Sequence, residues 1–330
     1  MPRSVLDHPR FRNEEAAYAY VESIVWPNGR VCPHCGVIGE SARLKGKSTR
    51  IGVYKCYACR KPFTVKVGTI FEKSHVPMHI WLQAMHLMCS SKKGFSANQF
   101  CRVLGVDFKT GWFIGHRIRE AMIPSGGGAG PLGGEGKIVE SDETYTVYRE
   151  GGPTWILHPK YGWQKQRSGA DRVPVVTLVE RGGRARSHKV DNVTAATLRD
   201  VVFGGADTKS RLMTDELRSY RRIGQRFAGH DAVDHGKEEW ARRLADGTKA
   251  HTNTVEGFFS ILKRGIYGCY FHVSEGHLHR YLAEFDFRYS NRMALGINDE
   301  ERTEIAIRGI IGKRLTYRTT RGEASATPSA

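Results

Sequence analysis

The chain has 330 residues, which at ~100 to 200 residues per domain allows two or three domains and excludes a single small peptide-like fold. Its 51 Lys and Arg outnumber its 34 Asp and Glu, so the net charge of +17 favours a polyanionic partner, with nucleic acid the first expectation. No run of ~18 apolar residues could span a bilayer, and the N-terminus lacks the apolar core of a signal peptide, so we expect a cytoplasmic protein without a membrane partner.

Residues 1–75 are expected to hold a short helix and a zinc ribbon. Acidic residues followed by good helix formers in EEAAYAYVESI predict a helix over 14–24. Two cysteine pairs follow it, in CPHC and CYAC: Cys32 with Cys35, and Cys56 with Cys59. Each pair can present two thiolates to one ion, and four thiolates complete the tetrahedral shell of zinc. Paired CxxC motifs favour zinc over reactive dithiols, and the closed shell makes this zinc structural.

Residues 76–124 have the pattern of a helix-turn-helix module. Apolar side chains at helical spacing predict a core helix over 78–90. A helix opened by Ser96, a turn at Gly105 and a second helix then follow. In a DNA-binding module the second helix enters the major groove, whereas a plain helical hairpin with a glycine turn is the alternative. The polar positions expected to contact DNA are Lys109, Thr110, Arg117 and Arg119.

Seven glycines in residues 125–136 predict a flexible linker and a domain boundary. Beyond the linker, KIVESDETYTVY predicts a strand, VPVVTLVE and RARSHKV predict a hairpin, NVTAATLRDVVF predicts a helix, and SRLMTDE predicts a short strand. This order favours an α/β domain over residues 137–312. The composition near the C-terminus predicts a disordered tail over 313–330.

Three acidic residues stand where such a domain would place an active site. Asp142 lies in the first strand, Asp215 ends the short strand, and Glu256 lies on the predicted helix TVEGFFSILKRGI. A carboxylate is costly to desolvate without a partner, and divalent cations supply one while serving phosphoryl transfer. Taken singly, each residue could instead cap a turn or face solvent.

Lys263 lies two helical turns after Glu256 on the same helix face, roughly 10 Å along the axis. This spacing is too long for an i,i+4 ion pair. A carboxylate that binds a metal and an ammonium that holds the neighbouring DNA phosphate would need such an arrangement.

The sequence resembles the DDE transposases of bacterial insertion sequences, in the group that carries an N-terminal zinc ribbon. The resemblance rests on SDETY at 141–145, TDELRSY at 214–220, HTNTVEGFFSILKRG at 251–265 and GHLHRYLAEFDFRYSNR at 276–292. It also includes CPHC, CYAC and KTGWFIGHRIR, and therefore covers nearly all of residues 30–292.

The resemblance implies an RNase H-like catalytic domain, a mixed sheet flanked by helices, preceded by a small β zinc ribbon and an all-α helix-turn-helix module. It implies that Asp142, Asp215 and Glu256 bind Mg²⁺ or Mn²⁺ and that Lys263 is the basic residue that follows the triad. Some members of this group use asparagine as the third ligand, so Asn253 in the same segment stays an alternative to Glu256.

The activity implied is metal-dependent cleavage of element ends and strand transfer into target DNA, by two-metal phosphoryl transfer. The implied partners are double-stranded DNA and further copies of the chain assembled on it, in the nucleoid region of a bacterial cytoplasm. Two alternatives remain open: a transposase-derived DNA-binding regulator without catalysis, and a nuclease of the same fold without strand transfer.

Several other polar residues and cysteines have expected roles outside the metal triad. Glu140 shares a strand face with Asp142 and could support or replace a ligand. Solvated or capping roles are expected for Asp231, Asp234 and His235, and contact with solvent or DNA is expected for His251, His272, His277 and His279. Buried free thiols are expected for Cys89, Cys101 and Cys269.

Overall fold

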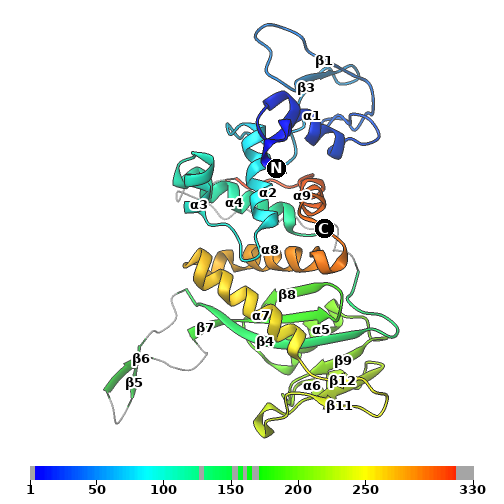
Figure 1. The fold of residues 1–330 in the computed structure, drawn as a ribbon, viewed down its shortest axis with the longest axis vertical. Coiled ribbons are helices and arrows are strands. Elements are labelled where there is room, and N and C mark those ends of the chain that lie inside the picture. The colour runs from blue at the N-terminus through cyan, green and yellow to red at the C-terminus, as the bar shows by residue number, and fades with distance from the viewer. Residues whose placement is uncertain (1–3, 126–129, 151–154, 159–161, 166–170, 317–330) are drawn as a thin grey trace.

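A computed structural model describes residues 4–125, 130–150, 155–158, 162–165 and 171–316. The ribbon and its helix form one end of the elongated molecule, a helical layer forms the middle, and a β-sheet with its own helices forms the other end (Figure 1). None of the described helices has the length and apolar character that crossing a membrane requires.

The N-terminal ribbon follows a capped helix. Asn13 accepts a hydrogen bond from the Ala16 N–H at 2.9 Å and opens α1 (Glu14–Val25), which confirms the predicted first helix. The ribbon is an antiparallel sheet of β1 (Ser41–Arg43), β2 (Tyr54–Cys56) and β3 (Pro62–Phe63). Its small core contains Tyr54 and Phe63 together with two of the cysteines.

The middle layer contains α2 (Met78–Ser90), α3 (Ala97–Leu104) and α4 (Phe108–Met122), so the predicted helices are confirmed. Ser96 forms a capping box at the start of α3, and Gly105, with φ of 67°, ends that helix in the left-handed conformation that glycine favours. Asp107 then caps α4. The local sequence therefore encodes the turn between the two helices, whatever the pair binds.

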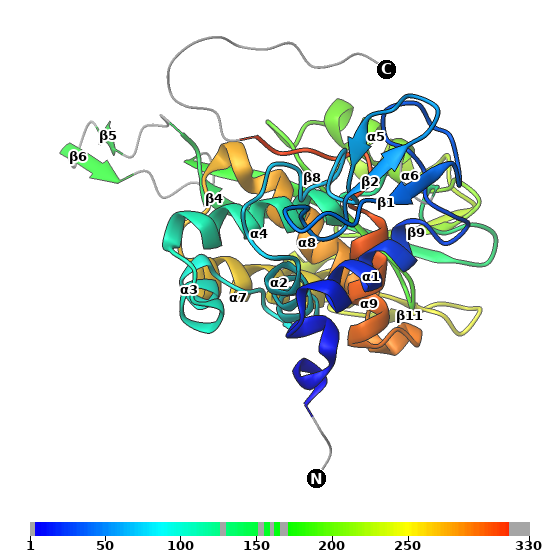
Figure 2. The ribbon, with the colours of Figure 1, turned by 90° about the horizontal axis from the view of Figure 1, so that it is seen from above.

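A C-terminal helix, α9 (Asp299–Arg308), completes this middle layer and was not predicted. Its apolar residues Ala306 and Ile307 are buried in the same core as Val21 of α1 and Trp81 of α2. The chain thus returns from the sheet to the N-terminal helices, and the views of Figures 1 and 2 agree on this placement. The helical layer is therefore built from both ends of the chain.

The large sheet is mixed and has the strand order β10-β9-β4-β7-β8. Its strands are β4 (Ile138–Tyr148), β7 (Arg172–Glu180), β8 (Ala185–Lys189), β9 (Arg211–Thr214) and β10 (Gly229–Ala232). β4, β7 and β8 form an antiparallel meander, whereas β9 runs parallel to β4 and β10 runs parallel to β9. The α/β expectation is confirmed.

Helices cover both faces of this sheet because β7 is apolar on both sides. Val173 and Val175 of β7 pack with α7 (Asn253–Gly265) and α8 (Leu278–Ser290), while Val176 and Leu178 pack with α5 (Ala195–Gly205) and α6 (Tyr220–Gly224). The alternation along β7 thus assigns one helical layer to each face.

The smaller elements lie outside these layers. Two antiparallel ribbons are formed by β5 (Trp155–His158) with β6 (Gly162–Lys165) and by β11 (Arg242–Arg243) with β12 (Lys249–Ala250). Short 3-10 turns span Val5–Asp7, Pro9–Phe11, His235–Lys237, Glu275–His277 and Met293–Leu295, and a π turn spans Ile266–Tyr270.

The described part of the predicted linker packs against the sheet domain. Leu132 is buried, and its N–H donates to the Gly205 carbonyl at 2.8 Å. A Cβ at Gly133 would come within 2.0 Å of the Ser210 hydroxyl oxygen, so glycine is required there for close packing. Residues 126–129 of the predicted linker lie outside the described residues. The high glycine content therefore reflects, in part, a tight approach to α5 and β9.

The predicted tail and the lone cysteines differ partly from expectation. Residues 317–330 lie outside the described part of the chain, but Lys313 donates to the Ala121 carbonyl at 3.2 Å and Leu315 accepts from Arg117. Cys89 is a buried free thiol as expected, whereas Cys101 and Cys269 are only half-buried.

Candidate active site and zinc site

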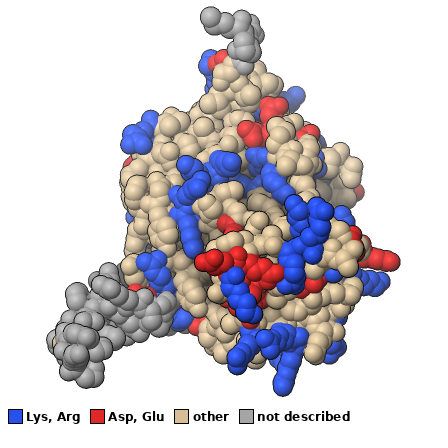
Figure 3. All heavy atoms as spheres, turned by 60° about the horizontal axis from the view of Figure 1, so that its bottom comes forward, with Lys and Arg blue, Asp and Glu red and all other residues tan. Residues whose placement is uncertain are grey.

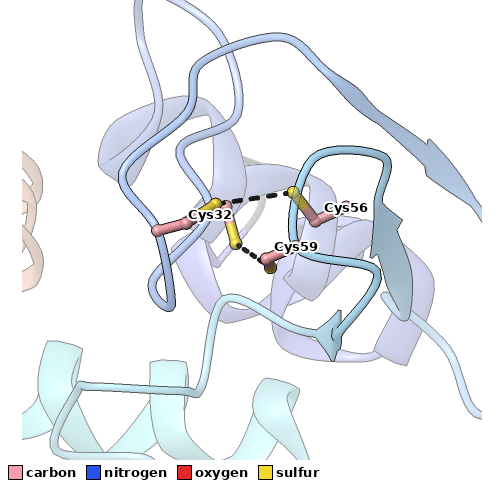
Figure 4. Close-up of side chains that lie close together, drawn as sticks. Cys32, Cys56 and Cys59 are labelled. Carbon is pink, nitrogen blue, oxygen red and sulfur yellow. Dashed lines mark hydrogen bonds between the residues drawn. The ribbon is translucent and has the colours of Figure 1, made fainter.

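The four cysteines of the ribbon converge on one point. Their sulfur atoms lie within 4.8 Å of one another, with 3.7 Å between Cys32 and Cys59 and 3.7 Å between Cys35 and Cys56 (Figure 4). Four thiolates at ~2.3 Å from a tetrahedral zinc ion would be separated by about 3.8 Å. The cluster therefore fits a structural zinc ion, as predicted.

A second cluster lies where β9 ends beside β4. The parallel register pairs Glu140 with Met213, and continuing it by two residues places Asp142 beside Asp215, the first residue after β9. Asp142, Asp215 and also Glu143 each bring a carboxylate oxygen within 4.8 Å of the other two. The structure therefore brings together two predicted site residues that are far apart in the sequence, and adds Glu143, which was not predicted.

The three carboxyl groups of this cluster are costly to ionise together. Burial raises the pKa of Asp142 to about 7, and the negative charges of Asp215 and Glu256 add to that rise, while the Glu143 N–H and Lys263 oppose it. Burial, with the charges of Asp142 and Asp215, likewise raises the pKa of Glu143 to about 8. A divalent cation would stabilise the ionised carboxylates, and Mg²⁺ and Mn²⁺ prefer oxygen ligands of this kind.

Helix α7 presents the other predicted site residues to the same region, since α7 packs on β4 and β7. Glu256 lies outside the close cluster and accepts from the Thr252 hydroxyl at 3.0 Å, but its charge still acts on Asp142. Lys263 is exposed two turns further on, and Asn253 is exposed at the first position of the helix.

His235 lies closer to this site than the sequence indicated. Its Nε2 lies 3.5 Å from Glu256 Oε1 and 3.3 Å from the Thr252 hydroxyl oxygen. Asp234 pairs with Lys237 at 2.9 Å near the surface, as expected for a loop residue. Asp231 is not a loop residue, because it lies in β10 and pairs with Arg211 at 2.8 Å. No sequence pattern places a loop histidine beside a helix that starts almost twenty residues later.

Glu140 holds the start of α7 and has no oxygen left for a metal. Its side chain is 0% exposed, and it accepts from the backbone N–H groups of Thr254 at 2.8 Å and Val255 at 2.9 Å. Arg181 Nε donates to it at 2.6 Å, and His251 Nδ1 lies 3.2 Å away. Glu140 was expected either to support a metal ligand or to replace one. The structure favours the first role, because this anchor fixes the start of the helix that carries Glu256.

We expect Glu140→Gln to reduce catalysis by roughly tenfold or more, because a neutral amide offers one acceptor oxygen where the carboxylate offers two and because half-buried Arg181 loses its charge partner. DNA-end binding should be unchanged. Both effects are measured on the full chain, as the cleavage rate and the affinity for DNA ends. Exposed Glu135→Gln is the control. Unchanged cleavage by a variant with a lowered melting temperature would show that Glu140 serves stability alone.

Two of the predicted DNA contacts on α4 are wrong. Arg117 and Arg119 are only 5% and 3% exposed. Arg117 Nη1 donates to the carbonyl oxygens of Ile70 at 2.7 Å and Glu72 at 3.0 Å. Arg119 Nε donates to buried Glu284 at 2.7 Å, which ties α4 to α8. Their helical positions face the interior because α8 and the segment before α2 pack around this part of α4.

The first turn of α4 remains accessible. Lys109 is exposed, and Thr110 is half-buried, with its hydroxyl donating to Asp107 at 2.6 Å. At the opposite end of the molecule, Lys and Arg side chains surround a hollow with an acidic patch at its margin (Figure 3). Basic side chains next to carboxylates are the arrangement that a phosphodiester substrate and metal ions would require.

Two segments of the chain match known protein families. Residues 12–62 match the family model of a transposase zinc-ribbon domain, and residues 131–290 match that of an ISXO2-like transposase domain. An uncharacterized protein in transposable element ISH50 of Halobacterium salinarum is 26% identical over 285 residues, which cover 84% of this chain and 91% of that protein. The matched segments contain the four clustered cysteines and all three clustered carboxylates.

Proposed function

Since the chain belongs to the zinc-ribbon-bearing DDE transposases of insertion sequences, we propose that it cleaves element ends and joins them to target DNA at the carboxylate cluster. The observation that carries this proposal is the parallel register of β4 and β9, which places Asp142 beside Asp215 at the end of the sheet.

Asp142, Asp215 and Glu256 would hold Mg²⁺ or Mn²⁺, which supplies Lewis-acid chemistry for in-line phosphoryl transfer. Exposed Lys263 holds a neighbouring phosphate, since it follows Glu256 by two turns of α7. The anchor between Glu140 and α7 keeps both side chains at a fixed distance from β4. Glu256, whose charge acts on Asp142, is the proposed third ligand, and Asn253 remains the alternative.

The helices α3 and α4 are proposed to act as a helix-turn-helix that binds the element ends, with Lys109 and Thr110 in the groove-facing first turn of α4. The net charge of +17 supports a DNA partner. An element has two ends that must be held together, so we also propose that several copies of the chain assemble on the DNA.

Lys109→Ala in the full chain should weaken binding to element-end DNA and reduce the slope of log affinity against log salt by about one. Fluorescence anisotropy over a salt series measures both quantities. Arg199→Ala is the matched control, because Arg199 is exposed on α5 and paired with its neighbour Asp200. An unchanged salt slope in Lys109→Ala would remove Lys109 from the DNA interface.

The two alternatives predict different products. A DNA-binding regulator would leave labelled end DNA intact in Mg²⁺, and a nuclease would cut it without joining it. A transposase should cut the end and also join it to a supercoiled target plasmid. Incubating the purified chain with a labelled element end and such a plasmid distinguishes all three, and a failure to form joined product under cleavage conditions would contradict the proposal.

A further inference from the structure

Glu143 has no role in the proposed function, yet it lies in the carboxylate cluster. Neighbouring residues on a strand point to opposite faces, so Asp142 shares a face with Glu140 and Glu143 shares a face with Ser141. Their carboxylates still converge because β9 ends at Thr214, and β4 continues past that end. Carboxylates from both faces of the sheet therefore reach the space beyond the end of β9.

Tyr220 fixes the carboxylate of Glu143 on the α6 side of the sheet. The Tyr220 side chain is fully buried, its hydroxyl donates to Glu143 Oε1, and Ser141 Oγ lies 2.9 Å from the same hydroxyl oxygen. A tyrosine hydroxyl has one proton, so Ser141 must donate to Tyr220 when Tyr220 donates to Glu143. This leaves the second oxygen of Glu143 available to a ligand.

The surroundings of Glu143 differ from those of Glu140, the other buried glutamate of β4. Glu140 is neutralised by Arg181 and bonded to the N-terminus of α7. Among the described residues, no ion pair reaches Asp142, Glu143 or Asp215. Three close carboxylates repel one another without a cation, and a glutamine could accept the bond from Tyr220 without that repulsion. A purely structural role therefore does not account for a glutamate here.

We propose that Glu143 is a further ligand of the metal centre and that Tyr220 is the residue that positions it. This inference rests on the proposed function and extends its ligand set from Asp142, Asp215 and Glu256 to a carboxylate on the opposite face of β4. The motifs SDETY and TDELRSY each then contribute an aspartate to the centre, and the second also supplies the tyrosine that orients the glutamate of the first.

The test is Mn²⁺ binding to full-length Glu143→Gln, measured by electron paramagnetic resonance and by the Mn²⁺-induced shift in melting temperature. Glutamine keeps an acceptor for Tyr220 but removes one charge, so the metal-free variant should melt at or above the wild-type temperature. Its affinity for Mn²⁺ should fall at least about tenfold. Exposed Glu135→Gln is the control and should bind Mn²⁺ like the wild type.

Unchanged Mn²⁺ affinity in Glu143→Gln would overturn the inference, as would a lower metal-free melting temperature with an unchanged metal-induced shift. Tyr220→Phe keeps the aromatic ring and leaves the Glu143 carboxylate in place. It should weaken Mn²⁺ binding less than Glu143→Gln does, and high Mn²⁺ should restore cleavage. Wild-type affinity for Mn²⁺ in Tyr220→Phe would show that Tyr220 does not position Glu143.

If Asp142→Asn loses Mn²⁺ and Glu143→Gln does not, only the inference fails. If neither variant loses Mn²⁺, the metal centre of the proposed function fails.

Discussion

Replacing Asp142 or Asp215 with asparagine should abolish strand cleavage, with a loss of roughly a hundredfold or more, and should leave binding to element-end DNA intact. Both aspartates lie at the end of the sheet, whereas the proposed DNA-binding turn of α4 belongs to the separate helical layer. An amide keeps the shape of the side chain but removes the charge on which metal binding depends. Cleavage of labelled end DNA in Mg²⁺ and in Mn²⁺, beside a binding assay, measures the effect.

Asp200→Asn on α5 is the matched control, because Asp200 is exposed and lies outside the carboxylate cluster. Normal cleavage by Asp142→Asn or Asp215→Asn would contradict the metal centre. The same assay separates the two candidates for the third ligand. Glu256→Ala should lose cleavage to a similar degree and Asn253→Ala should retain most of it, whereas the reverse pattern would assign the ligand to Asn253.

The second large effect concerns zinc. The wild-type chain should bind about one zinc ion, and Cys56→Ser should lose the ion and unfold the ribbon, because zinc binding supplies on the order of 10 kcal/mol to so small a fold. Cys56 is fully buried beside Tyr54 and Phe63, and these aromatic residues form most of the remaining ribbon core. The sheet domain has separate hydrophobic cores and should stay folded.

Metal analysis and limited proteolysis of the full chain test this expectation. Cleavage sites should appear in the ribbon of Cys56→Ser while the segment from β7 to α8 stays resistant. Cys101→Ser, a half-buried thiol of α3 outside the cluster, should keep both zinc and protease resistance. Zinc-free wild-type protein, purified without chelator, would exclude the zinc ribbon.

The elements predicted from the sequence are those with strong local signals. Capping residues and helical periodicity located α1 to α5, and the alternation of KIVESDETYTVY located β4. The zinc ligands were predictable because a CxxC pair has a characteristic spacing, and Asp142 and Asp215 were predictable because they end or interrupt apolar strands within specific motifs.

The remainder depends on tertiary packing. Arg117 and Arg119 have the composition of a DNA-binding helix, and only tertiary packing shows that they are buried. Arg119 packs against α8, and Arg117 packs against the segment before α2. Likewise, the period of two along a strand places Glu143 on the opposite face from Asp142, and the early end of β9 is what lets both reach one point. The return of α9 to the N-terminal helices joins residues almost three hundred positions apart, for which one sequence carries no local signal.

The most direct test of the metal centre is a crystal structure of the full chain soaked in Mn²⁺, with data collected for the anomalous signal of manganese. We expect a peak between the carboxylates of Asp142 and Asp215, with a carboxylate oxygen of Glu143 within bonding distance, and a separate zinc signal among the four cysteines. A manganese peak elsewhere, or none, in protein that still cleaves element-end DNA would contradict the account.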